Sequence, residues 1–304
     1  MTPGFAFITG GSTVAALQTA LQQHARRCSV PAAALLVAPS QAQEQSQEQL
    51  QDQRILLCFA LGLTRVGLIT QAGRIVSDIE AEQLCALLVR RQNGEPVAYI
   101  VGQREFYGLP FRVSDSVLIP RPDTELLVDL ALERLAVRGR LLDLGTGSGA
   151  IAVALAHSRP DAAITALDVS GAALDVARHN ASVNGVVLRL LESDWYAALK
   201  LERFDMIVAN PPYIARGDVH LAQGDLRFEP VNALTDHGDG LSALRHIIEG
   251  AAQHLAPQGW LLMEHGHDQS DSVRSHLSAH GFSEVRSWID LAGIERVSGG
   301  RSSI

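Results

Sequence analysis

The spacing of hydrophobic and polar positions changes near residue 140. Upstream, leucines recur at helical intervals, as at Leu84, Leu87 and Leu88, and predict helices. Downstream, short continuous apolar runs alternate with stretches of helical spacing, a pattern that predicts a parallel sheet with both faces covered. The strand candidates are Leu141–Leu144, Ile164–Leu167, Val187–Leu191, Met206–Val208, Trp260–Glu264 and Val285–Ile289.

Residues 1–93 predict a small helical domain. Ser77 and Glu80 match a capping box, in which each side chain bonds the backbone amide of the other residue, and Pro96 ends the helix that follows. The tract Gln41–Gln53 carries almost no apolar surface, so we expect a solvated loop or a frayed helix there.

Residues 94–118 predict a hairpin that links this domain to a second one, residues 119–304. Two β-prone runs, Tyr99–Val101 and Phe111–Val113, flank a segment that contains a glycine and a proline. Such a pattern is typical of two short antiparallel strands.

The composition narrows the class of protein. The 304 residues carry a net charge of −8, and this balance weighs against stable nucleic-acid binding. The three cysteines are scattered, which predicts reduced thiols in a cytoplasmic protein. No apolar run is long enough to span a bilayer, so we expect no membrane contact. No set of cysteines, histidines and carboxylates has metal-ligand spacing, so we predict no metal site.

A glycine-rich loop follows the first strand of the second domain. Glycines allow a sharp turn and a close approach to a ligand, and the N-terminus of the next helix offers free N–H groups. Asp168 ends the next strand, where a carboxylate can accept both ribose hydroxyls. The spacing fits NAD and S-adenosylmethionine equally well, and a merely tight turn is a third interpretation. The loop residues predicted to bind cofactor are Gly145, Thr146, Gly147, Ser148 and Gly149.

Two further residues have two interpretations each. Asp143 either contributes to the methionine end of the cofactor or caps the loop. Trp195 follows the third strand, where it either covers the adenine or packs in the core. His265, after a later strand, is interpreted as a structural histidine.

The tetrapeptide Asn210-Pro211-Pro212-Tyr213 follows the fourth strand and carries the most information. Two prolines stiffen the loop and remove its N–H donors. The side-chain carbonyl of Asn210 and the main-chain carbonyl of Pro211 can accept both hydrogens of an –NH2 group, and Tyr213 offers a flat face to a planar acceptor. Because a sulfonium methyl is already electrophilic, methyl transfer needs in-line placement of the nitrogen more than acid–base chemistry. Asn210 is expected to contact the cofactor as well.

With this loop, the chain resembles the amino-methyltransferases that carry an Asn-Pro-Pro-Tyr motif. Among them, it resembles the release-factor glutamine methyltransferases. The likeness covers roughly residues 75–297. The segments that carry it are Gly94–Tyr99, Arg104–Tyr107, Leu118–Glu125, Ser193–Trp195, Arg227–Pro230, Asp239–Leu241 and Glu264–Gly266.

The resemblance implies a seven-stranded, Rossmann-like class I methyltransferase domain with a small N-terminal helical domain that docks the substrate. It implies the cofactor S-adenosyl-L-methionine and, as partners, peptide-chain release factors, methylated on the glutamine of a Gly-Gly-Gln loop. Asn210, Pro211 and Tyr213 would be catalytic. Arg121 and Glu125, with Pro122, either line the substrate cleft or serve domain packing and helix capping.

Alternatives stay open at this point. A sister group methylates a glutamine of a ribosomal protein but lacks the Ile119–Glu125 segment. A nucleic-acid adenine methyltransferase uses the same loop and would need a basic groove. An NAD-dependent oxidoreductase would explain the glycine-rich loop but not the double proline. A binding module without turnover is the fourth possibility.

Overall fold

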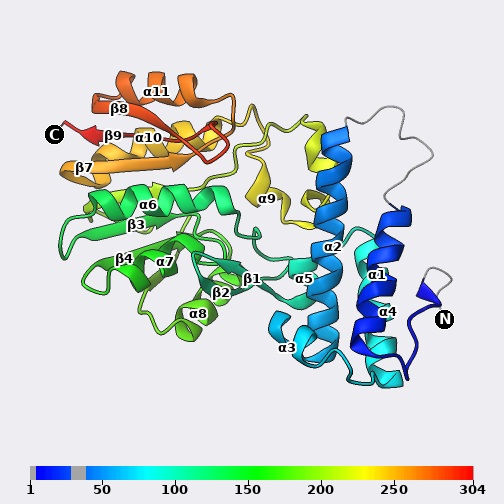
Figure 1. Ribbon diagram of the computed structural model, residues 1–304. Helices are drawn as coiled ribbons and strands as arrows, with labels where there is room; N and C mark the ends of the chain where they lie inside the picture. The colour runs from blue at the N-terminus through cyan, green and yellow to red at the C-terminus, as the bar shows by residue number, and fades with distance from the viewer. Residues whose placement is uncertain (1–4, 29–38, 304) are drawn as a thin grey trace. The chain divides into compact units, whose positions relative to one another are not determined.

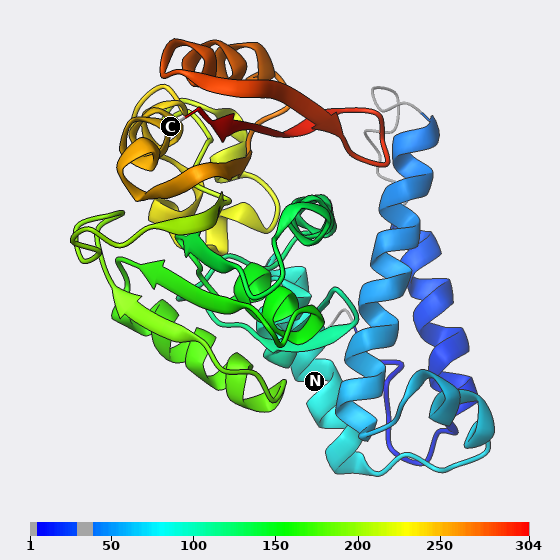
Figure 2. The ribbon, with the colours of Figure 1, turned by 90° about the vertical axis from the view of Figure 1, so that its left-hand side faces the viewer.

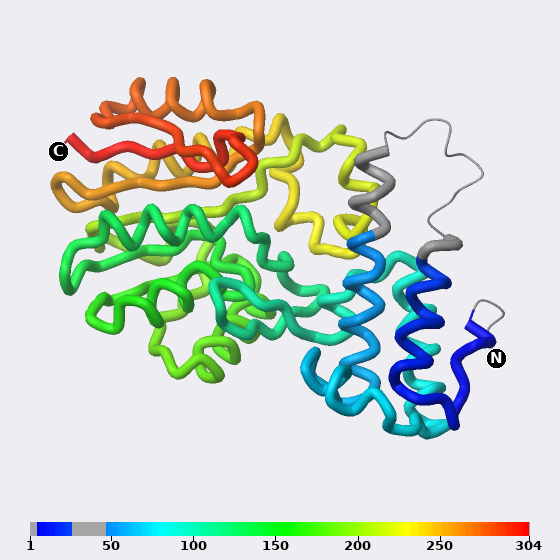
Figure 3. Tube along the Cα trace, viewed as in Figure 1, coloured from blue at the N-terminus to red at the C-terminus, as the bar shows by residue number. Residues whose placement is uncertain are grey.

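The computed structural model describes the backbone of residues 5–28 and 39–303 and the side chains of residues 5–25 and 47–303 (Figure 3). The chain divides into two compact units, Met1–Val101 and Gly102–Ile304. Each unit has its own hydrophobic core. No described helix is long and apolar enough to cross a membrane.

The first unit is helical, as predicted. Its helices are α1 (Val14–Cys28), α2 (Pro39–Leu61), α3 (Arg65–Thr70), α4 (Asp78–Gln92) and α5 (Val97–Val101) (Figure 1). The predicted capping box at the start of α4 is confirmed, because the Ser77 hydroxyl accepts from the Glu80 amide and the Glu80 carboxylate accepts from the Ser77 amide.

Two predictions for this part of the chain need correction. The alternative of a loop at Gln41–Gln53 is wrong, since α2 runs through the whole tract; Gln, Glu and Ala are good helix formers and no glycine or proline interrupts them. The strand predicted at Tyr99–Val101 is wrong as well. Pro96 favours a helical start, and its carbonyl accepts the amides of Tyr99 and Ile100, which closes the first turn of α5.

The second unit begins with a two-stranded hairpin, β1 (Gln103–Phe106) and β2 (Leu109–Arg112). A hairpin was predicted in this region, but its first strand lies a few residues later along the chain. Asn180, fully buried on α8 (Gly171–Val183), fixes the hairpin to the rest of the unit. Its side chain accepts from the Arg112 amide at 2.7 Å and donates to the Ser148 carbonyl at 2.8 Å.

A seven-stranded sheet forms the centre of this unit, in the order β5-β4-β3-β6-β7-β9-β8. Five neighbouring strands are parallel, but β9 runs antiparallel to both its neighbours, so the expectation of a wholly parallel sheet is wrong at this edge. The strand bounds are β3 (Arg140–Leu144), β4 (Ala163–Asp168), β5 (Arg189–Glu192), β6 (Phe204–Ala209), β7 (Leu255–Glu264), β8 (Phe282–Ile289) and β9 (Glu295–Ser302).

Helices cover both faces of the sheet (Figures 1 and 2). Alternate residues of each strand supply the two cores: Leu141 packs with α6 and α7, and Leu142 packs with α10. This two-sided burial explains the nearly continuous apolar strands of the sequence. The main helices are α6 (Glu125–Arg134), α7 (Ala150–Ser158), α8, α10 (Ser242–His254) and α11 (Ser270–Ala279), with shorter turns η2 (Pro122–Thr124), η3 (Val219–Ala222), η4 (Leu226–Phe228) and α9 (Val231–Leu234).

Candidate functional site

The strand register brings three predicted site residues, Gly145, Asp168 and Asn210, to one edge of the sheet. Leu191, Leu167, Leu144, Ala209 and Met263 form one row across β5, β4, β3, β6 and β7. The strands are parallel, so the residues that follow this row lie together at their carboxyl ends, where open α/β sheets bind ligands. Those following residues are Glu192, Asp168, Gly145, Asn210 and Glu264.

The glycine-rich loop leaves β3 in a conformation that requires glycine. Gly145, Gly147 and Gly149 have φ values of 71°, 54° and 80°. An added Cβ at Gly145 or Gly147 would meet no atom within 4 Å, so the left-handed backbone, and not close packing, requires glycine there. The two residues between these glycines, Thr146 and Ser148, are buried.

Asp168 organises this loop. One carboxylate oxygen accepts from the Gly147 amide at 2.8 Å and the other accepts from the Ser170 amide at 2.9 Å. Burial raises the pKa of this carboxyl, and these backbone donors work against the rise. Asp168 therefore shapes the turn through both of its carboxylate oxygens.

Asp143 lies below the loop and is fully buried. One of its oxygens accepts from the Thr146 hydroxyl at 2.6 Å, while the other has no hydrogen-bond partner among the described residues. Burial raises the pKa of Asp143 to about 7, against the Thr146 bond, and the nearby charge of Asp168 raises it further. An unpartnered buried carboxylate oxygen beside a second acid fits a ligand that brings a positive charge and N–H donors.

The acceptor loop follows β6, and its first residue has a fixed side chain. The amide nitrogen Nδ2 of Asn210 donates to the Thr124 hydroxyl oxygen at 3.1 Å. This contact turns Nδ2 toward Thr124 and leaves Oδ1 as the acceptor.

Glu264 also holds Tyr213. The Tyr213 hydroxyl donates to Glu264 Oε1 at 3.2 Å. Burial raises the pKa of Glu264 to about 7, and hydrogen bonds from Thr124 and Tyr213 oppose that rise. The carboxylate therefore fixes the Tyr213 end of the Asn-Pro-Pro-Tyr loop.

A small cavity of about 60 Å³ opens beside this loop. Arg121 reaches its wall and pairs with Glu229, a residue whose side chain is fully buried and which also accepts from the Ile119 amide at 3.0 Å. Burial raises the pKa of Glu229, although the guanidinium of Arg121 opposes this. The lining residues are Leu118, Arg121, Asn210, Pro211, Tyr213, Ile214, Leu226, Ala233 and Leu234.

Some predicted site residues lie elsewhere. Glu125 does not line this cavity: it starts α6 and accepts from the Tyr107 amide at 2.9 Å, which anchors the hairpin. Pro212 is half-buried and also does not line the cavity. Trp195 packs against the core beneath α10, with its ring 6.0 Å from that of His246, so its described contacts fit the packing interpretation. His265 is buried and bonds Ser298 at 2.7 Å, in line with a structural histidine.

Several residues that shape the site have no signal of their own in the sequence. Thr124, Glu229 and Glu264 lie in segments that carry the family resemblance, without a role of their own. Asn180 and Gln269 carry no local signal for their contacts with Ser148 and Tyr213, which span 32 and 56 residues. Among the described residues, no group of three or more His, Cys, Asp or Glu side chains could hold a metal ion.

The chain is similar to proteins of known family. A family model described as "Methyltransferase small domain" matches residues 122–239, and one described as "PrmC N-terminal domain" matches residues 34–102. A release factor glutamine methyltransferase of Burkholderia pseudomallei is 55% identical, over 82% of this chain and 91% of its own length. One of Neisseria gonorrhoeae is 51% identical, over 82% and 92%. The crystal structure of a methyltransferase from Pyrococcus furiosus shares the fold, with a TM-score of 0.51 at 18% identity over 71% of this chain and 98% of its own.

Proposed function

The chain belongs to the release factor glutamine methyltransferases, and we propose that it methylates the side-chain amide nitrogen of the glutamine in the Gly-Gly-Gln loop of peptide-chain release factors, with S-adenosylmethionine as methyl donor. The observation that carries this proposal is the orientation of Asn210 at the wall of the cavity, with Nδ2 held by Thr124 and Oδ1 left to accept.

The cofactor end of the site fits the methyl donor. We propose that the loop Gly145–Gly149 and Asp168 bind the adenosine part, and that the unpartnered oxygen of Asp143 receives the methionine ammonium group. When bound, S-adenosylmethionine supplies an electrophilic methyl group on a sulfonium. Asp143 is fully buried and Asp168 is partly buried, and the pKa of each is raised. These two acids favour a cationic ligand, because its charge stabilises their ionised forms.

The acceptor end acts on a poor nucleophile. The lone pair of an amide nitrogen is delocalised into its carbonyl. Asn210 Oδ1 and the main-chain carbonyl of Pro211 accept the two amide hydrogens and hold the nitrogen in line with the methyl group. Both acceptors would also stabilise the positive charge that grows on the –NH2 group as the N–C bond forms and the S–C bond breaks. The methylated nitrogen would then return to neutrality by releasing one proton to solvent. The flat ring of Tyr213 packs against the planar amide.

The residues around the cavity favour a peptide substrate. Arg121 is held in place by the buried Glu229, so the cavity wall has one ordered cation and otherwise mostly apolar side chains. We propose that Arg121 borders the channel for the Gly-Gly-Gln loop and that the helical first unit docks the release factor. Trp195 remains a predicted contact of the cofactor, and Pro212 remains a predicted contact of the substrate.

The test is incubation of the purified chain and S-adenosylmethionine with a purified release factor, followed by intact mass and fragment-ion mapping. We expect a gain of one methyl group on the glutamine of the Gly-Gly-Gln loop. The proposed substrate would be wrong if the release factor stays unchanged while a ribosomal protein, or adenine in nucleic acid, becomes methylated.

A further inference from the structure

The segment between β7 and α11 runs beside the acceptor loop although it lies more than fifty residues further along the chain. Met263 pairs with Ala209 in the sheet, so Glu264 emerges next to Asn210. Five residues later, Gln269 occupies the position just before α11. Both side chains turn to the same residue, Tyr213.

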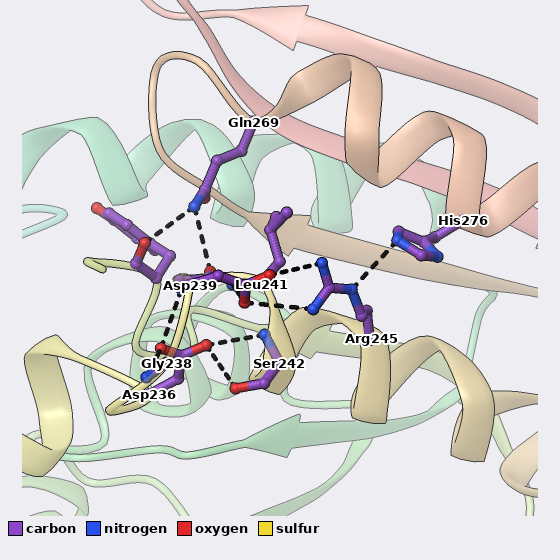
Figure 4. A network of polar contacts seen from close by, with 10 residues as sticks. Asp236, Gly238, Asp239, Leu241, Ser242, Arg245, Gln269 and His276 are labelled. Atoms are coloured by element: carbon purple, nitrogen blue, oxygen red, sulfur yellow. Dashed lines mark hydrogen bonds and ion pairs between the residues drawn. The ribbon is translucent and has the colours of Figure 1, made fainter. Parts of the chain in front are cut away.

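Gln269 holds the backbone of Tyr213. Its Nε2 donates to the Tyr213 carbonyl oxygen at 3.0 Å and to the Gly240 carbonyl oxygen at 3.1 Å, and its Oε1 accepts from the Gly266 amide at 2.8 Å. Figure 4 shows Gln269 reaching from the start of α11 toward the turn that contains Asp236 and Ser242. Because all the polar atoms of this amide have backbone partners, its orientation is fixed.

The turn on the other side of Gln269 is rigid and closely packed. The Asp236 carboxylate accepts from the amides of Gly238, Gly240 and Ser242 at 2.8, 3.0 and 2.8 Å. Gly240 has a φ of 82°, and a Cβ there would lie 2.5 Å from the Tyr213 carbonyl oxygen. Only glycine therefore allows this turn to approach the acceptor loop so closely.

We propose that Gln269 and Glu264 are positioning residues for methyl transfer, which hold Tyr213 by its carbonyl and by its hydroxyl and so fix the Asn-Pro-Pro-Tyr loop relative to the cofactor. This inference rests on the proposed function. A loop stiffened by two prolines moves as one body, so a shift of Tyr213 displaces the acceptor carbonyl of Pro211. A misplacement of about 1 Å reduces turnover by roughly 100-fold.

The first test replaces Gln269 with glutamate, which keeps the size but places an oxygen against two carbonyl oxygens. We expect kcat on a release factor to fall by roughly 100-fold while the Kd for S-adenosylmethionine stays unchanged. The matched control is Gln258→Glu, because Gln258 lies near the start of β7 and bonds Ser302. Equal kcat values for Gln269→Glu and the control would overturn the proposal.

A second variant, Gln269→Ala, removes the donors without adding a charge. We expect a smaller loss of kcat, again with unchanged cofactor affinity and a nearly unchanged melting temperature. A variant that instead melts early and loses cofactor binding in parallel would assign Gln269 a folding role and overturn the positioning role. Wild-type chain that fails to methylate a release factor would count against the proposed function itself; active wild type with an equally active Gln269→Ala would count only against this inference.

The role of Glu264 is tested by a double-mutant cycle with Tyr213. Glu264→Met and Tyr213→Phe each remove the same hydrogen bond. If that bond fixes the loop, the double variant should lose little more kcat than the single variants do. Fully independent losses would overturn the part of the proposal that concerns Glu264.

Discussion

Replacement of Asp143 by asparagine should stabilise the second unit at pH 8 and, at the same time, weaken cofactor binding. Asp143 is fully buried below the glycine-rich loop, and burial raises its pKa from the usual value near 3.8 to about 7. The fold therefore carries this carboxylate at an energetic cost whenever it is ionised. A cationic ligand with N–H donors would offset that cost, as expected of a binding site that is not optimised for stability.

The magnitude follows from proton linkage. A pKa of about 7 in place of 3.8 corresponds to about 4 kcal/mol. Since the native state binds the proton more tightly than the unfolded state, the stability of the wild-type chain falls as pH rises from about 4 to about 7. Asparagine cannot ionise, but its buried –NH2 group costs about 1–3 kcal/mol where Oδ1 lacks a partner. The Asp143→Asn variant should thus be more stable than wild type by about 1–3 kcal/mol at pH 8, and less stable at pH 4.

Urea unfolding between pH 4 and pH 8 measures this difference. Tryptophan fluorescence reports on the second unit, because Trp195, Trp260 and Trp288 all belong to it. Asp175→Asn, at an exposed carboxylate on α8, controls for the change in net charge. Calorimetry should show a weaker affinity for S-adenosylmethionine by roughly 10- to 100-fold. A difference in stability that does not change with pH would refute the argument that the fold pays to bury this charge.

Three further predictions concern the rest of the site. Asn210→Ala should reduce turnover by roughly 100- to 1,000-fold, because one preorganised acceptor is lost, while calorimetry should show intact cofactor binding. Asp168→Ala should weaken the affinity for S-adenosylmethionine by roughly 10- to 100-fold, and an unchanged Kd would contradict its role at the cofactor. Arg121→Met should destabilise the second unit by about 3 kcal/mol in urea unfolding, because it leaves the Glu229 carboxylate buried without its partner. Adding Glu229→Gln to that variant should restore part of the loss, and no recovery would argue against the ion pair as the cause.

The sequence was sufficient to predict the elements whose signals are local. The capping box at Ser77, the glycine-rich loop after β3 and the stiff loop after β6 all follow from neighbouring residues. Parallel strands with a shared carboxyl edge then imply that Gly145, Asp168 and Asn210 lie together, and the strand register confirms it.

Predictions failed or stopped where tertiary contacts decide the outcome. The run Tyr99–Val101 favoured a strand, but it lies in a short helix that begins directly after Pro96. β9 was not predicted, because Gly299 and Gly300 weaken a strand pattern. In the structure, Gly299 allows β9 to lie close to β7, since a Cβ at this position would lie 2.3 Å from the Leu261 carbonyl oxygen. The contacts of Gln269 with Tyr213 span 56 residues, and no local pattern indicates such a pair.

The central claim is that an oriented Asn210 amide presents an acceptor to a glutamine –NH2 group beside a methyl donor. Its most direct test is fragment-ion mapping of a release factor after a single turnover with wild-type chain and, in parallel, with Asn210→Ala. The account predicts one methyl group on the glutamine of the Gly-Gly-Gln loop with wild type and almost none with the variant. Equal methylation by both chains, or a methyl group at any other residue, would contradict it.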